Sequence, residues 1–267
     1  MTTILSAENV TKSYSSRDGK EIVAVSNLSI DVKEGEFVCI VGASGCGKST
    51  LLNMFAGFIQ PSKGSVNLRG KPITGIEPRC GMMFQAYALF PWRTLIKNVE
   101  FGLEMRGVPR SERRDRAQKY IDLVQLSGFE DRYPYELSGG MQQRASLARL
   151  LAVDPEVLLM DEPFAALDAM TRQVLQEELL EIQERSKKTI LFITHNLDEA
   201  LILADRIVVL SSRPGRVKSI ITNDLPRPRH VTAQLSPEYS EMKAKVWTEV
   251  EEEVGKHVQA EQLAKAV

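Results

Sequence analysis

The sequence predicts an α/β fold whose core is a mostly parallel β-sheet. Four short, continuous apolar runs indicate strands buried on both faces, which is typical of parallel sheets; the runs are Phe37–Val41, Val157–Met160, Ile190–Ile193 and Ile207–Leu210. Stretches with helical character lie between these runs, as connections between parallel strands require. A chain of 267 residues is long enough for one sizeable α/β domain with a substantial core.

The segment between Val41 and Val157 is too long for a single crossover. Residues 64–70 alternate apolar and polar side chains between two glycines, which predicts a small antiparallel β subdomain. A mainly helical subdomain is expected at about residues 86–150. Within it, residues 109–127 place Ala117, Ile121 and Val124 near helical spacing, with Ser111 as the expected N-cap.

The C-terminal part has its own pattern. Its apolar residues recur at every fourth position and predict an amphipathic helix that packs back onto the core; they are Met242, Val246, Val250 and Val254. We therefore divide the chain into a domain of residues 1–235, which contains the helical subdomain, and a helical tail of residues 236–267.

Composition excludes several classes of protein. The 34 Lys and Arg residues nearly balance the 35 Asp and Glu residues, so no broad basic face for nucleic acid is expected. The arginine cluster at residues 110–116 is interpreted as a solvated helix face rather than an RNA site. No apolar window is long enough to span a membrane, and the N-terminus lacks the pattern of a secretory signal. Three cysteines, few and irregularly spaced, favour a reducing, cytoplasmic environment.

A phosphate-binding loop follows the first predicted strand. Residues 42–49 match G-x-x-x-x-G-K-[ST], in which glycines let backbone N–H groups approach phosphates; they are Gly42, Ala43, Ser44, Gly45, Cys46, Gly47, Lys48 and Ser49. Lys48 is expected to reach the β- and γ-phosphates, and the Ser49 hydroxyl to bind Mg²⁺. The apolar sequence from Thr50 onwards begins the helix that the motif requires. Cys46 is interpreted as a tolerated small residue rather than a reactive thiol.

Two acidic residues end the second predicted strand. Asp161 is placed to hold the Mg²⁺ of a bound nucleotide, and Glu162 to polarise an attacking water molecule. An acidic N-cap is the alternative interpretation for this pair, and the phosphate loop makes it the weaker one.

A second anion-binding cup lies at residues 137–144, where Ser138, Gly139 and Gly140 directly precede a predicted helix. With these three motifs, the chain resembles the ATP-binding subunits of ABC transporters over nearly its whole length. Leu137–Gln142 matches the signature motif of that family, and four single residues match further markers in order and spacing: Tyr14, Gln85, Asp168 and His195.

The resemblance implies a P-loop NTPase core of RecA-like type and a role for each marker. Tyr14 would stack on adenine, Gln85 would reach Mg²⁺ and water, Asp168 would belong to the loop after the catalytic acid, and His195 would contact the γ-phosphate. Taken singly, Tyr14 could be a packing residue, Gln85 a strand-end amide and His195 a satisfied core histidine.

The resemblance also explains the second cup. In such proteins two subunits meet head to tail, and each ATP lies between the phosphate loop of one subunit and the signature motif of the other. We therefore expect an ATPase dimer, of identical or paired subunits, peripheral on the cytoplasmic face of the inner membrane. Its partners would be two membrane-spanning permease subunits and an extracytoplasmic substrate-binding protein.

Several segments resemble the importers of nitrate, taurine, alkanesulfonates or pyrimidine precursors in bacteria, among them residues 88–94 and 213–216. A chromosome-maintenance ATPase is disfavoured because no sustained heptad array occurs between Gln85 and Leu137. A translation-associated ATPase is disfavoured because the chain carries one nucleotide-binding core. A signalling ATPase without a membrane partner stays open as an alternative. Phe90–Trp92 is expected to contact the permease, with burial of Trp92 in the helical subdomain as the alternative.

Overall fold

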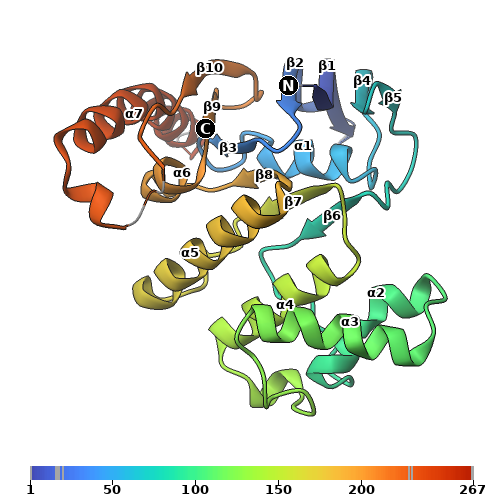
Figure 1. The fold of residues 1–267 in the computed structure, drawn as a ribbon. Helices are drawn as coiled ribbons and strands as arrows, with labels where there is room; N and C mark the ends of the chain where they lie inside the picture. The colour runs from blue at the N-terminus through green and yellow to red at the C-terminus, as the bar shows by residue number, and fades with distance from the viewer. Residues whose placement is uncertain (1, 16–18, 20, 228, 230, 266–267) are drawn as a thin grey trace.

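The computed structural model describes residues 2–265 except residues 16–18, 20, 228 and 230. A six-stranded sheet with the order β10-β9-β3-β8-β7-β6 lies at its centre (Figure 1). All neighbours pair in parallel except β10, which is antiparallel to β9. The strands are β3 (Phe37–Val41), β6 (Cys80–Met83), β7 (Val157–Asp161), β8 (Thr189–Ile193), β9 (Arg206–Leu210) and β10 (Val217–Thr222). The predicted parallel sheet is confirmed, since the four apolar runs form β3, β7, β8 and β9.

A second, four-stranded sheet packs against one face of the first. Its order is β2-β1-β4-β5, and all its pairs are antiparallel. The strands are β1 (Thr3–Ser15), β2 (Glu21–Lys33), β4 (Lys63–Leu68) and β5 (Lys71–Pro72). β4 confirms the strand expected at residues 64–70, whereas β1 and β2 carry bulges that break the two-residue alternation by which strands are recognised.

The central strands are buried because both faces of the sheet are covered. Along β3, Phe37, Cys39 and Val41 join a core with the helices, and Val38 and Ile40 join the core beneath the antiparallel sheet. Successive side chains point to opposite faces of a strand, so five apolar residues in a row fill two cores at once. The helices are α1 (Lys48–Phe55), α2 (Leu95–Met105), α3 (Arg110–Leu123), α4 (Gly139–Ala152), α5 (Ala169–Ser186), α6 (Leu197–Leu203) and α7 (Pro237–Lys265).

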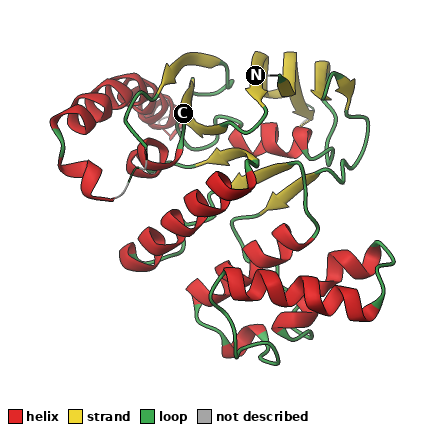
Figure 2. Cartoon of the chain, viewed as in Figure 1, coloured by secondary structure: helices red, strands yellow, loops and turns green. Residues whose placement is uncertain are grey.

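The helical subdomain consists of α2, α3 and α4, which lie between β6 and β7 in the chain and form the separate lower lobe in Figure 2. Helix α4 also packs on the sheet: a Cβ atom on Gly81 of β6 would lie 2.4 Å from Cδ1 of Leu150. The expected N-cap of α3 is wrong. Pro109 occupies that position without a side-chain hydrogen bond, and Ser111 lies inside the first turn, because the fixed φ of proline already suits a helix start.

Helix α7 packs along the core beside α6. Val246 is fully buried, and Met242 and Val250 are partly buried against the same core, whereas Val254 is 42% exposed. Polar contacts add to this packing: the Tyr239 hydroxyl donates to Asp198 Oδ1 at 2.7 Å. None of the helices in the described part of the chain has the length and apolar character that a bilayer crossing requires.

Candidate functional site

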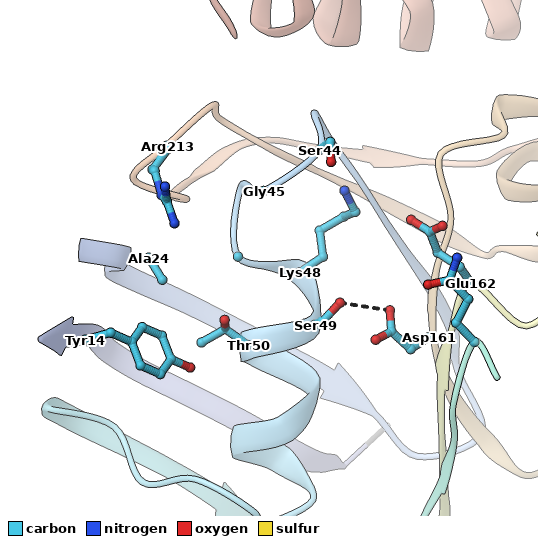
Figure 3. A pocket seen from close by; sticks show the side chains of 12 residues that line it. Tyr14, Ala24, Ser44, Gly45, Lys48, Ser49, Thr50, Asp161, Glu162 and Arg213 are labelled. Carbon is cyan, nitrogen blue, oxygen red and sulfur yellow. Dashed lines mark hydrogen bonds between the residues drawn. The ribbon is translucent and has the colours of Figure 1, made fainter. Parts of the chain in front are cut away.

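A cleft of about 470 Å³ opens at the carboxyl edge of the central sheet (Figure 3). Parallel strands bring their carboxyl ends to one edge, where ligands of α/β proteins usually bind. Residues from six parts of the chain line the cleft, and ten of the twelve are residues singled out in the sequence. The lining residues are Tyr14, Ala24, Ser44, Gly45, Gly47, Lys48, Ser49, Thr50, Gln85, Asp161, Glu162 and Arg213.

The phosphate loop joins β3 to α1 and turns sharply at its last glycine. Gly47 has φ +97°, in the region that favours glycine, and a Cβ atom there would lie 2.6 Å from Cγ2 of Val25. The loop therefore packs directly on β2. Gly42, Ala43 and Cys46 form its buried side, while Ser44 and Gly45 are exposed.

Lys48 turns its ammonium group back into the phosphate loop. Its Nζ donates to the carbonyl oxygens of Gly42 and Ala43, both at 2.9 Å, and the side chain is only 7% exposed. A buried ammonium needs such acceptors because its desolvation is costly. Since a phosphate oxygen is a stronger acceptor than a carbonyl, the same ammonium is placed to bind a phosphate held by the loop.

Cys46 is buried beneath the phosphate loop. Burial raises the pKa of its thiol, although nearby Lys48 acts to lower it. All three cysteines are free and buried, so the interpretation of Cys46 as a tolerated small residue agrees with its surroundings.

Hard oxygen ligands gather where α1 begins opposite the end of β7. Ser49 Oγ donates to Asp161 Oδ1 at 3.1 Å, and Gln85 lines the same cleft. Burial raises the pKa of Asp161, while the hydrogen bond from Ser49 lowers it. A hydroxyl, a carboxylate and an amide are the oxygen donors that suit Mg²⁺, which takes few protein ligands and completes its shell with phosphate and water. These residues fit the ion expected with a nucleotide.

Glu162 and His195 meet beside these oxygen ligands. His195 Nδ1 lies 3.2 Å from Glu162 Oε2, and the imidazole is 66% exposed, so His195 is not a core histidine. Glu162 has φ +45°, an unusual value for a residue with a side chain. Such a conformation costs about 1–3 kcal/mol and is typical of functional positions. His195 does not line the cleft itself but reaches it through this contact.

Buried polar residues fix the loop that carries His195. The Thr194 hydroxyl donates to Glu199 and accepts from the backbone N–H of Asn196 at 2.9 Å. Arg172 Nε lies 3.5 Å from the same Glu199 and donates through Nη2 to the carbonyl of Leu167 at 2.9 Å. Arg172 thus ties the loop of His195 to the loop that precedes α5.

Asp168 serves as the N-cap of α5. Its carboxylate accepts from Thr171 N at 3.0 Å, and this hydrogen bond lowers the pKa of Asp168. The side chain is exposed and does not line the cleft. Within one chain it therefore has a helix-capping role, and its expected place at a bound nucleotide stays a prediction.

The second cup lies at the start of α4, apart from the cleft. Ser138 is the N-cap of α4 and accepts from Met141 N at 3.3 Å. Ser138 and Gly139 are exposed, and a Cβ atom on Gly139 would lie 2.9 Å from Oη of Tyr87. The structure does not bring Ser138, Gly139 or Gly140 among the residues that line the cleft.

The side chains of Tyr14 and Trp92 are both exposed. Tyr14 is 42% exposed at the edge of the cleft, with Lys12 Nζ 5.3 Å from its ring centroid. Trp92 is 72% exposed, and its ring centroid lies 5.6 Å from that of Phe90. Burial of Trp92 in the helical subdomain is therefore wrong as an interpretation, and the ring of Tyr14 is partly open at the cleft.

Two cleft residues were not predicted as site residues. Ala24 belongs to β2, whose pattern gave no sign of a site, and Arg213 follows β9 in a segment noted above only for its resemblance to importers. The sequence held one signal for Arg213 as a site residue. It is a cationic side chain that directly precedes Pro214 and Gly215, shortly after a buried strand.

The family model that describes the ABC transporter matches residues 25–165. An uncharacterized ABC transporter ATP-binding protein of Methanocaldococcus jannaschii is 52% identical over 250 residues, which span 94% of this chain and 92% of that relative. The chain belongs to the ABC transporter family. It is an ABC ATPase, and its P-loop fold is confirmed.

Two further relatives of this ABC ATPase carry names that specify a solute. The nitrate import ATP-binding protein NrtD of Synechocystis is 51% identical over 77% of this chain and 77% of its own length. The bicarbonate transport ATP-binding protein CmpC of Synechococcus elongatus is 44% identical over 86% of this chain but only 35% of its own length.

Solved structures match as well. A dimeric bacterial ABC transporter cassette superposes with a TM-score of 0.74 at 33% identity, covering 84% of this chain and all of the other. The same cassette in a post-hydrolysis state, bound to ADP and phosphate, gives a TM-score of 0.72 at 32% identity with the same coverage.

Proposed function

We propose that this ABC ATPase powers the import of a small inorganic oxyanion through a separate membrane permease. The relationship to NrtD carries this proposal, because identity of 51% extends over 77% of both chains. CmpC supports the same class of solute, since nitrate and bicarbonate are both small, singly charged oxyanions. Taurine, alkanesulfonates and pyrimidine precursors, also expected from the sequence, serve as competing solutes in the test below.

In ATP hydrolysis the cleft residues would bind the metal ion, bind the phosphates and accept a proton from water. Ser49, Asp161 and Gln85 would hold Mg²⁺, which supplies positive charge to the phosphates when bound. Lys48 would exchange its two carbonyl acceptors for phosphate oxygens, and Glu162 would accept a proton from the attacking water.

The remaining site residues would contact the two ends of the nucleotide. His195, oriented by Glu162, would donate to the γ-phosphate. Tyr14 would provide the platform for the base, because its exposed ring borders the same cleft.

The active unit would be a head-to-tail dimer. The exposed N-terminus of α4 supports this arrangement, because Ser138, Gly139 and Gly140 offer donors and a positive helix end without lining the cleft of their own chain. The dimeric form of the related cassette supports it as well. The assembly would sit peripherally at the cytoplasmic face of the inner membrane, on two permease subunits that receive solute from an extracytoplasmic binding protein.

The experiment is to isolate the intact complex from membranes, identify its subunits and measure ATP turnover with candidate solutes on the binding protein. We expect nitrate or bicarbonate to stimulate turnover at least severalfold over the basal rate. Stimulation by taurine or an alkanesulfonate alone would overturn the oxyanion proposal but keep the importer. Isolation without any membrane subunit would favour a signalling ATPase instead.

A further inference from the structure

Arg213 extends into the nucleotide cleft from the loop between β9 and β10. Figure 3 shows its guanidinium on the side of Tyr14 and Ala24, across the phosphate loop from Asp161 and Glu162. Among the residues that the structure describes, Arg213 forms neither a hydrogen bond nor an ion pair, whereas Lys48 in the same cleft has two acceptors. Arg213 is exposed, so its position in a phosphate-binding cleft, rather than a lack of hydrogen-bond acceptors, points to an anionic ligand.

The loop of Arg213 is fixed to the floor of the cleft. Gly215 N donates to Ala24 O at 2.9 Å, and Ser26 N donates to Gly215 O at 3.0 Å, so the loop adds to the edge of β2. A Cβ atom on Gly215 would lie only 1.9 Å from the carbonyl oxygen of Cys46. The backbone of this loop is therefore packed on the phosphate loop itself, and its position follows that of the phosphate loop.

Helix α7 holds the same loop from the other side. The carboxylate of Glu253, 3% exposed, accepts from Ser212 N at 2.7 Å and from Ser212 Oγ at 3.1 Å. Burial acts to raise the pKa of Glu253, but hydrogen bonds from Lys256 and Ser212 outweigh it, so the pKa lies below its usual range. Glu253 is thus a buried, ionised group that fixes the residue next to Arg213.

The position of Arg213 in the cleft indicates which part of the nucleotide this side chain would contact. Lys48 and the oxygen ligands occupy the end that binds the β- and γ-phosphates, and Tyr14 borders the opposite end. Arg213 lies on the Tyr14 side of the phosphate loop. We propose that Arg213 binds the α-phosphate of the nucleotide and that helix α7, through Glu253 and Ser212, positions it there. This inference rests on nucleotide binding in the cleft.

The first test compares ATP, ADP and AMP. For Arg213→Ala we expect the Kd of MgATP, MgADP and AMP to rise by a similar factor, about tenfold, because all three nucleotides carry the α-phosphate and AMP carries no other. Arg213→Lys should recover part of the loss. An unchanged Kd for all three nucleotides, or a rise that spares AMP, would overturn the proposal. Lys48→Ala tests nucleotide binding in the cleft separately from the role of Arg213. If this variant binds nucleotide normally, the cleft is not the nucleotide site and the proposed function fails.

The second test addresses Glu253 as a positioning residue. Glu253→Ala should raise all three Kd values by a common, smaller factor than Arg213→Ala, and the double variant should bind no more weakly than Arg213→Ala alone, because the two residues act through one contact. The matched control is Glu241→Ala, which removes an exposed carboxylate of α7 and should leave all three Kd values unchanged. Additive losses in the double variant, or an equal effect of Glu241→Ala, would contradict the positioning role.

Discussion

The Nδ1 atom of His195 lies 3.2 Å from Oε2 of Glu162, although the two residues follow different strands. Only a doubly protonated imidazole can donate through Nδ1 to this carboxylate and, at the same time, through Nε2 to a γ-phosphate. The contact therefore joins the proposed general base to the residue proposed to contact the γ-phosphate. It also holds the side chain of a glutamate whose backbone is strained.

Replacement of this glutamate should separate binding from chemistry. In Glu162→Gln the amide keeps the shape and a contact to His195 but cannot accept a proton from water. We expect ATP hydrolysis to fall by about 10²–10⁴-fold, while ATP affinity stays near that of the parent and an ATP-bound dimer accumulates. Steady-state hydrolysis and size-exclusion chromatography with ATP measure the two effects. Hydrolysis near the parental rate would show that Glu162 is not the general base.

The proposed head-to-tail dimer can be tested by placing two defects on the same subunit or on different subunits. When Lys48→Ala is on one subunit and Ser138→Arg on the other, one composite site receives both defects and the other receives none. We expect nucleotide trapping at one site per dimer. When both substitutions are on the same subunit, each site receives one defect, and trapping should fail at both. If each chain formed its own complete site, the results would be reversed. Trapping would fail at both sites when the substitutions are on different subunits, and would persist at one site when they are on the same subunit.

Trp92 should act in coupling rather than in folding. Because the side chain is 72% exposed, Trp92→Ala should leave the melting temperature and basal nucleotide binding nearly unchanged. We expect association with the permease to weaken more than tenfold, which corresponds to about 2 kcal/mol for an aromatic anchor, and solute-stimulated turnover to be lost.

The matched control is Trp247→Ala, which removes a 53% exposed tryptophan from α7. It should leave permease association intact. A large fall in the melting temperature of Trp92→Ala, with normal permease binding by the folded fraction, would assign Trp92 to stability instead.

Acid should loosen the attachment of α7. Hydrogen bonds from Lys218 and Lys256 lower the pKa of Glu252 from 4.5 to about 2. A carboxylate with a lowered folded pKa binds fewer protons than in the unfolded chain. Its contribution is therefore complete above about pH 4.5 and is lost as the pH falls towards 2. Lys218→Met should lower the urea midpoint most at neutral pH, and the difference from the parent should shrink below pH 4.5.

Fluorescence of Trp247 on the same helix reports this transition, with Trp92→Phe as the background. Lys71→Met, which removes an exposed lysine of β5, is the matched control and should show no such pH dependence. A difference that is constant from pH 7 to pH 3 would mean that the ion pair contributes nothing to the docking of α7.

Local motifs made much of this molecule predictable. The phosphate loop is a strand, a turn and a helix in immediate succession, so its structure depends on neighbours in the chain, and the run ending in Asp161 is recognisable for the same reason. The bulges of β1 and β2 hid those strands because each bulge reverses the alternation of buried and exposed positions.

Arg213 could not be predicted as a site residue from its neighbours alone. It reaches the cleft through the packing of its loop on β2 and through Glu253, and both contacts join positions far apart in the sequence. The prediction of Ser111 as the N-cap was wrong because Pro109, two residues earlier, occupies that position.

Helix α4 connects the central sheet at one end to Ser138 at the other. Its C-terminal half rests on β6, where Gly81 leaves room for Leu150, and its N-terminus carries Ser138. Fourteen residues give it a length of about 20 Å, so a tilt of about 3° at the sheet end would displace the Ser138 end by about 1 Å. That displacement is comparable to the difference between a hydrogen bond made and one lost. A small change of packing beneath α4 would therefore decide whether the far end of the helix engages a phosphate.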